Sequence, residues 1–466
     1  MSAHETLEAA RARDAADPLR GFRERFALPR NARGEPLVYL SGHSLGLMPL
    51  AARELVNEEL EEWARLGVTG HEHARRPWVP YHENLSAGLA SLTGARVSEV
   101  VAMNSLTVNL HLMLASFYRP AGKRTRVLME AGAFSSDRHA VASQIAWRGL
   151  DPEAALIELA PRAGEDTLPE EAIEESLARH GEEIALVLWP GVQFRTGQAF
   201  DLARIARVAH RHGCVVGFDL AHSIGNTPLA LHETQADFAV WCSYKYLNAG
   251  PGAIGGCFVH QRHADAQPRT AHAGGLPGAR LAGWWGHEER TRFLMEPEFR
   301  AAGGVAAWQV SNPPILAAAP LIASLAIFTE ARIERLREKS VQLTDSLERL
   351  LRPLAGQVHI ITPHDSARRG CQLSLRITGG APRGARVFET LTERGVVCDW
   401  RSPDIMRVAP VPLYNRFEDV WQFARVLSEV LEGVAGAARG CRPSTSSVRD
   451  LPVRCSRCCS HGAASR

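Results

Sequence analysis

The pattern of apolar positions predicts alternating strands and helices in the middle of the chain. Runs of consecutive apolar residues, typical of buried strands, occur at 125–130, 183–192, 214–222 and 238–243. Between them, apolar residues recur every three to four positions, which predicts helices at 135–147 and 201–213. Strands that alternate with helices indicate an α/β fold with a mostly parallel sheet.

The pattern changes after Pro314. Residues 330–351 carry apolar side chains at three- to four-residue steps, which predicts one long amphipathic helix. Short strands are predicted next, then a last helix, at 370–378, 395–400, 405–411 and 417–434. These elements indicate a second, smaller α+β domain.

The chain is therefore expected to divide into three structured parts and a tail. We expect an N-terminal arm and small-domain segment at 1–45, a large α/β domain at 46–312, a small C-terminal domain at 313–435 and a disordered tail at 436–466. The tail lacks hydrophobic periodicity and is rich in Ser, Gly and Arg, so it cannot bury enough surface to become ordered.

The nine cysteines fall into two groups, one in the structured parts of the chain and one in the tail. Five lie singly in apolar, strand-like surroundings and are expected in the core: Cys214, Cys242, Cys257, Cys371 and Cys398. The other four, Cys441, Cys455, Cys458 and Cys459, lie in the tail. Their C-x-x-C spacing, with His461 nearby, also permits a zinc site, but the composition favours a disordered extension.

Composition and charge exclude several classes of protein. The chain of 466 residues is 45% apolar and 22% charged, with a net charge of +2, so no strong field for nucleic acid or membranes is implied. The N-terminus lacks the apolar core of a signal peptide. Residues 301–329 carry no charge, but Pro320 breaks the apolar part, and a buried interdomain segment is predicted rather than a membrane span. A cytoplasmic protein is expected.

Lysine usage points to one residue. The chain has 53 Lys plus Arg, of which only Lys123, Lys245 and Lys339 are lysine. Lys123 and Lys339 lie in charged stretches and are predicted to be solvated. Lys245 follows an apolar run, within "WCSYKYLNAGPG". A desolvated lysine can lose its proton and form a Schiff base, which arginine cannot. A lysine at the surface end of a strand is the competing interpretation.

Other residues supply what a Schiff-base cofactor such as pyridoxal phosphate needs. Asp219 and His222 end a predicted strand, where Asp219 could hold a pyridinium or else form a helix cap or an ion pair. Ser105 or Thr107 begins a helix whose N-terminus could bind a phosphate or simply be capped. Phe134 offers an aromatic ring. Each feature alone is weak, but their order along the chain is specific.

That order resembles the fold-type I pyridoxal-phosphate enzymes and, among them, the kynureninase family. The motifs that carry the resemblance run from about Tyr39 to Asn415: "YLSGHSLGLMP", "GHEHARRPW", "NSLTVNLHLML", "GFDLAHSIGN", "WCSYKYLNAGPG", "GWWGHEERTRF", "SNPPI" and "RVAPVPLYN". The resemblance implies a homodimer with shared active sites. It also implies hydrolysis of L-kynurenine or 3-hydroxykynurenine to the anthranilate and L-alanine, in tryptophan degradation and NAD biosynthesis.

The resemblance also implies roles for individual residues. Lys245 would be the Schiff-base lysine and the base at Cα, Tyr244 would bind the phosphate and relay a proton, and Asp219 would hold the pyridinium. Further cofactor contacts would come from Leu106, Thr107, Phe134, Ser135, Ser136, Asp137 and His222, and from Trp284 and Asn312 of the partner subunit. Substrate contacts would come from Ser44, His71, Asn312 and Arg407, with Arg407 clamping the substrate carboxylate.

Two departures and one substrate expectation follow from the same alignment of motifs. Pro190 stands where family members can carry serine, and His43 stands where asparagine is common. His71 and Asn312 can both hydrogen-bond a phenolic hydroxyl, so 3-hydroxykynurenine is expected to be at least as good a substrate as kynurenine.

Three other functions compete with this interpretation. A cysteine desulfurase needs a nucleophilic cysteine on a loop near the cofactor, and the only loop-like cysteines lie in the tail. A generic aminotransferase is a second alternative. A non-catalytic cofactor-sensing regulator would need a DNA-binding module, and no helix-turn-helix signal or basic cluster precedes the core. We find no dinucleotide-binding G-x-G-x-x-G motif after any predicted strand.

Overall fold

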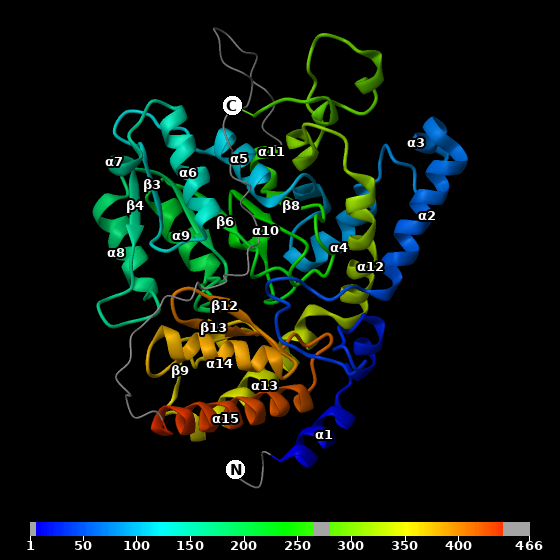
Figure 1. The fold of residues 1–466 in the computed structure, drawn as a ribbon. Coiled ribbons are helices and arrows are strands. Elements are labelled where there is room, and N and C mark those ends of the chain that lie inside the picture. Colours follow the sequence, from blue (N-terminus) through cyan, green and yellow to red (C-terminus); the bar gives the residue numbers. More distant parts are fainter. Residues whose placement is uncertain (1–5, 265–279, 441–466) are drawn as a thin grey trace, which may run out of the picture.

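A seven-stranded sheet organises the large domain of the computed structural model (Figure 1). The structure describes residues 6–264 and 280–440. The strand order of the sheet is β2-β8-β7-β6-β5-β3-β4. Only β8 runs antiparallel to its neighbours, so the mostly parallel α/β prediction is confirmed. The strands are β2 (Val100–Ala102), β3 (Arg126–Glu130), β4 (Leu156–Leu159), β5 (Ile184–Pro190), β6 (Val215–Asp219), β7 (Phe238–Trp241) and β8 (Gly256–Val259).

The continuous apolar runs arise because the sheet is covered on both faces. Along β5, Val187 and Trp189 join one buried cluster while Leu186 and Leu188 join another. Successive side chains of a strand point to opposite faces, so each face of this strand needs apolar residues. The helices of this domain are α2 (Leu50–Leu66), α3 (Gly70–His73), α4 (Glu83–Thr93), α5 (Leu106–Phe117), α6 (Ser135–Trp147), α7 (Pro152–Ala155), α8 (Glu170–His180), α9 (Leu202–Arg211), α10 (Leu231–Thr234) and α11 (Gln261–Ala264).

The small domain contains an antiparallel sheet of order β12-β13-β10-β9. Figure 1 shows its helices on the face turned away from the large domain. The strands are β9 (Val358–Ile360), β10 (Leu373–Ile377), β12 (Asp399–Arg401) and β13 (Ile405–Val408), and the helices are α13 (Ile333–Leu351), α14 (Ala381–Glu393) and α15 (Phe417–Gly440). This arrangement places Arg407 on a central strand.

The N-terminal segment belongs spatially to this small domain. Helix α1 (Leu7–Ala16) packs on α15, and β1 (Val38–Tyr39) pairs in parallel with β11 (Val396–Val397). The loop that follows β1 then runs back toward the large domain. This loop carries His43 and Ser44.

The predicted long helix at 330–351 is wrong at its first turn. Helix α12 (Ile315–Ala331) ends at Ala331, Arg332 breaks the helix with a φ of 65°, and α13 starts at Ile333. The two axes are bent by 80°. Helix α12 packs against α2 and α4, so the uncharged segment is largely buried inside the protein. Among the residues that the structure describes, no single helix is long and apolar enough to cross a membrane, and only the bent pair α12–α13 passes that test jointly.

Two further expectations are corrected. Lys339 is 6% exposed rather than solvated: its Nζ forms an ion pair with Asp17 (2.7 Å) and donates to the carbonyl of Pro412 (2.7 Å). Lys123 is exposed and pairs with Glu182, as predicted.

Residues 436–440 belong to α15 and not to the tail. The tail cysteines and His461 lie outside the described residues, whereas the five core cysteines are all buried and free, as predicted.

Candidate active site

A pocket opens at the carboxyl ends of β3, β5 and β6, where an open parallel sheet presents its ligand-binding residues. It brings together nine of the residues that the sequence singled out: Leu106, Thr107, Phe134, Ser136, Asp137, Asp219, His222, Tyr244 and Lys245. These residues come from four separate parts of the chain. Their convergence is the central observation of the site.

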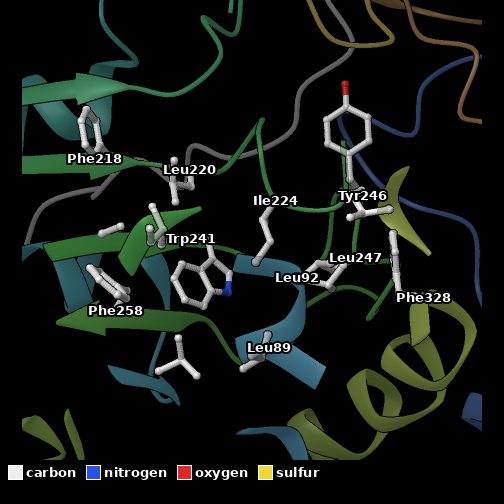
Figure 2. Close-up of a cluster of buried hydrophobic side chains, with 14 of the residues drawn as sticks. Leu89, Leu92, Phe218, Leu220, Ile224, Trp241, Tyr246, Leu247, Phe258 and Phe328 are labelled. Carbon is white, nitrogen blue, oxygen red and sulfur yellow. The ribbon is translucent and has the colours of Figure 1, made fainter. Parts of the chain in front are cut away.

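Lys245 is held by a tight turn after β7. The amide of Asn248 donates to the Lys245 carbonyl (2.9 Å), and Asn248 adopts a left-handed φ of 53°. The next residues, Tyr246 and Leu247, are anchored in a buried apolar cluster that also contains Phe328 of α12 (Figure 2). The lysine itself is half-buried, and its Nζ lies 2.9 Å from Nε2 of His222. The turn is thus fixed by the core while the amine faces the pocket.

Three carboxyl groups meet at the inner end of the pocket. Asp219 ends β6 and accepts a hydrogen bond from the amide of Ala221 (2.7 Å). Burial, followed by the charge of Asp219, raises the pKa of Asp137 well above its usual range. Burial also raises the pKa of Glu130 to about 8. Buried carboxylates are costly without a cation, so this end of the pocket fits a protonated ring nitrogen.

The same pocket also fits a phosphate. Ser105, the residue before α5, makes no side-chain cap bond, and neither does Phe134 before α6. Both helix N-termini contribute residues to the pocket, and the hydroxyls of Thr107 and Ser136 lie 2.7 Å apart. Uncapped N–H groups and the helix dipole favour an anion. Gly255 lets the chain pass closely, because a Cβ there would lie 3.2 Å from the amide nitrogen of Leu106.

Aromatic rings and a neutral imidazole complete the lining. The Phe134 ring centroid lies 5.8 Å from Lys245 Nζ and the Tyr244 ring 5.9 Å from it. Phe194 packs edge-on against Phe134 at 5.3 Å. Burial, followed by the charge of Lys245, lowers the pKa of His222 well below its usual value. His222 is therefore uncharged at neutral pH, and its Nε2 can accept a hydrogen bond from the Lys245 amine. Burial raises the pKa of Tyr244, so its hydroxyl keeps its proton.

Three predicted site residues lie elsewhere in the same chain. His71, Trp284 and Asn312 line a second cavity of about 610 Å³ that shares no lining residue with the first. All three side chains are exposed. The indole of Trp284 donates to the carbonyl of Arg292 (3.0 Å). Within one chain, this group does not meet Lys245.

The remaining predicted residues flank the pocket without lining it. Ser135 is exposed at the start of α6, and Ser44 is half-buried in the loop after β1. Arg407 is fully buried: its Nε donates to Asp399 (3.0 Å) and its Nη1 to the Phe194 carbonyl (2.7 Å). Burial lowers the pKa of Arg407 to about 10, so the guanidinium stays charged at neutral pH.

Two of the lining residues that the sequence analysis missed are Glu130 and Phe194. Glu130 ends β3 as Asp219 ends β6, and an acid at the end of a buried strand is a signal that could have identified it. Phe194 lies in a loop, and no pattern marks it. Pro190, noted as a departure, lines the pocket at the end of β5 and offers no hydroxyl or amide proton there.

Comparison with solved structures shows the fold. The chain superposes on a cysteine desulfurase from Thermococcus onnurineus with a TM-score of 0.68 and 18% identity, over 85% of this chain and 95% of that one. It also superposes on a C-DES mutant with glycine covalently linked to its PLP cofactor, with a TM-score of 0.69 and 20% identity, over 84% and 96% of the two chains. Both likenesses confirm the expected fold-type I architecture.

Comparison with curated proteins goes further. The chain is 56% identical to the kynureninase of Xanthomonas campestris pv. campestris over 89% of this chain and 95% of that relative. It is 55% identical to the kynureninase of Xanthomonas oryzae pv. oryzae over 88% and 95%. The model of the kynureninase C-terminal domain matches residues 336–427, and that of the DegT/DnrJ/EryC1/StrS aminotransferase family matches residues 73–232. This protein belongs to the kynureninase family.

Proposed function

We propose that the protein hydrolyses the Cβ–Cγ bond of L-kynurenine and 3-hydroxy-L-kynurenine, with pyridoxal 5'-phosphate as cofactor. The products are L-alanine and anthranilate or 3-hydroxyanthranilate. The observation that carries the proposal is the convergence of Lys245, Asp219, Phe134 and the α5 N-terminus in one pocket of a chain so similar to kynureninases. The reaction belongs to tryptophan degradation and can supply NAD biosynthesis.

The residues present suit this cofactor. Lys245 provides the amine for covalent attachment, and Asp219 provides the carboxylate for the ring nitrogen. Thr107 and the first amides of α5, with Ser136 and Tyr244, would hold the phosphate. Phe134 would lie against the ring. When bound, pyridoxal phosphate acts as an electron sink that makes the Cα proton of an attached amino acid acidic.

The protein's own residues then move and hold protons. The hydrogen bond between Lys245 and the neutral His222 keeps the amine directed into the pocket, where it can take a proton from Cα of the substrate. The Asp219 carboxylate favours a protonated ring nitrogen. The Tyr244 hydroxyl keeps its proton and can donate it to a departing group. The planar guanidinium of Arg407 is suited to a bidentate pair with the substrate carboxylate.

We also propose that the protein is a homodimer with shared sites. His71, Trp284 and Asn312 lie at the surface of their own chain, in the second cavity. The surrounding segments expose apolar side chains that are each more than half accessible: Trp63, Val68, Phe293, Leu294 and Met295. A second copy seated there would cover this surface and bring Trp284 and Asn312 to the neighbouring pocket.

We further propose a cellular location for the protein and a role for each domain. The five buried cysteines form no disulfide within the described chain, which supports a reducing cytoplasmic location. We propose that residues 46–312 act as the cofactor-binding domain, with 1–45 and 313–435 as the small domain. None of the described cysteines lines the pocket, so a desulfurase nucleophile is not present among them.

The proposal is tested by offering both substrates to the purified, cofactor-loaded protein and following the fluorescence of the two aromatic products. Turnover of either substrate supports it, and a bound cofactor without turnover of either would overturn it. Shared sites are tested with 3-hydroxykynurenine, by mixing inactive Lys245→Arg chains with Asn312→Leu chains, whose kcat/KM for this substrate is expected to be lowered. If the sites are shared, mixed dimers regain activity at one of their two sites; no recovery after verified subunit exchange contradicts the shared site.

A further inference from the structure

His43 is a buried histidine whose two ring nitrogens have no partner within the described residues. Its side chain is 0% exposed, and neither Nδ1 nor Nε2 makes a hydrogen bond. A neutral imidazole offers one donor and one acceptor, and leaving such groups unpaired in the interior is costly. A buried polar side chain without hydrogen bonds is not explained by packing alone and indicates a functional role.

The loop that carries His43 is hydrogen-bonded at both ends to segments that carry residues of the proposed site. At one end, Ala409, two residues after Arg407, donates its amide to the Leu40 carbonyl (2.8 Å). At the other end, Gly46 donates its amide to the Tyr244 carbonyl (2.9 Å), next to Lys245. His43 therefore lies on a short bridge between the residue proposed to hold the substrate carboxylate and the residue proposed to act at Cα.

The side chains around His43 agree with this placement. Its ring centroid lies 6.4 Å from that of His222, which hydrogen-bonds Lys245. The charged groups that face it are Arg407, Lys245 and Arg401, all cationic. Together with burial, they lower the pKa of His43 well below its usual value and keep the ring neutral. A neutral N–H in cationic surroundings is suited to an anionic acceptor.

We propose that His43 is a specificity residue that donates a hydrogen bond to the α-carboxylate of the substrate. Neither His43 nor Arg407 lines the pocket in this structure, so the carboxylate would enter the buried space between them when the substrate binds. This inference rests on the proposed function, since it takes the substrate to be an amino acid held between Lys245 and Arg407. The second donor would fix the direction of the carboxylate, while Arg407 supplies most of the charge. Amino acids would bind better than amines that lack the carboxylate.

The test compares His43→Leu, which removes both nitrogens at similar volume, with His43→Asn, which keeps a donor and an acceptor. For His43→Leu, kcat/KM for kynurenine is expected to fall roughly tenfold to 150-fold, mainly through KM, as for loss of a hydrogen bond to a charged group. The inhibition constant of kynuramine, the substrate analogue without the carboxylate, should stay unchanged. His43→Asn should restore most of the loss.

Thermal stability separates this role from a structural one. If His43 serves the substrate, His43→Leu keeps or raises the Tm, because an unpaired polar group leaves the core. His260→Leu is the matched control: His260 is also buried with an unpaired Nε2, but it follows β8 beside Asp237, at the edge of the sheet opposite the pocket. That variant should discriminate kynurenine from kynuramine as the wild type does.

Three results overturn the inference: normal kinetics in His43→Leu, equal losses for kynurenine and kynuramine, or a lowered Tm with unchanged discrimination. Failure of the wild type to cleave either kynurenine would instead overturn the proposed function. The two failures are therefore distinguishable.

Discussion

Glu130 makes the apoenzyme's stability depend on pH in a way that one isosteric substitution should abolish. Glu130 is 4% exposed at the end of β3, and burial raises the pKa of its carboxyl from the usual 4.5 to about 8. The folded protein therefore holds this proton up to about pH 8, whereas the unfolded chain releases it near pH 4.5. Between these values the folded state binds more protons, so the stability of the wild type falls as pH rises.

The magnitude follows from the same two values. Each pH unit between the two pKa values lowers the free energy of unfolding by about 1.4 kcal/mol. The loss is therefore about 3 kcal/mol at pH 7 and approaches about 5 kcal/mol above pH 8. Glutamine has the shape of the protonated acid and does not titrate. Glu130→Gln should therefore match the wild type near pH 4.5 and exceed its free energy of unfolding by about 3 kcal/mol at pH 7.

Urea unfolding of the two apoenzymes across pH 4.5–8.5 measures this difference directly. Glu175→Gln, at an exposed position on α8, is the matched control and should follow the wild type at every pH. Parallel stability curves for Glu130→Gln and the wild type would refute the reasoning, because they would show that Glu130 ionises alike in both states.

Four other predictions concern the site and the tail. Lys245→Arg should keep the fold but lose covalent cofactor and turnover; retained cofactor absorbance with activity would disprove its role. Asp219→Ala should still bind some cofactor but lose most activity, and near-normal turnover would point to another acid. Asn312→Leu should lower kcat/KM for 3-hydroxykynurenine selectively, by about 1–3 kcal/mol, whereas equal losses for both substrates would contradict a contact with the hydroxyl. Deleting residues 441–466 should leave Tm and turnover unchanged; zinc lost together with stability would argue for a metal site.

The parts of the fold that could be predicted are those with local causes. The continuous apolar run of β5 reflects a strand covered on both faces, and the same run recurs in β6 and β7. Asp219 follows from a rule of parallel sheets, since the carboxyl ends of the strands meet at one edge. Lys245 stood out because arginine supplies nearly every other cation of the chain.

The wrong predictions concern features that depend on contacts between residues distant in the sequence. Lys339 was expected in solvent because its neighbours along the chain are charged, yet its partners are Asp17 and the carbonyl of Pro412. The helix break at Arg332 has no proline or glycine to announce it. Both features depend on how the small domain packs against the N-terminal segment and α12. The hydrophobic pattern of the sequence does not predict that packing.

His71, Trp284 and Asn312 show a limit that applies to the sequence and to the structure of one chain alike: neither contains a partner subunit. The three residues span 241 positions of sequence and line one cavity at the surface, separate from the pocket of Lys245. An aromatic ring kept accessible beside Phe293, Leu294 and Met295 is unfavourable for an isolated chain, because that surface stays in water. In the proposed dimer, a second copy would remove this cost and would complete the substrate side of the pocket with the same contact. Dimer formation and substrate recognition would then depend on the same residues, so substitutions at Asn312 must be judged by kinetics and by molecular mass together.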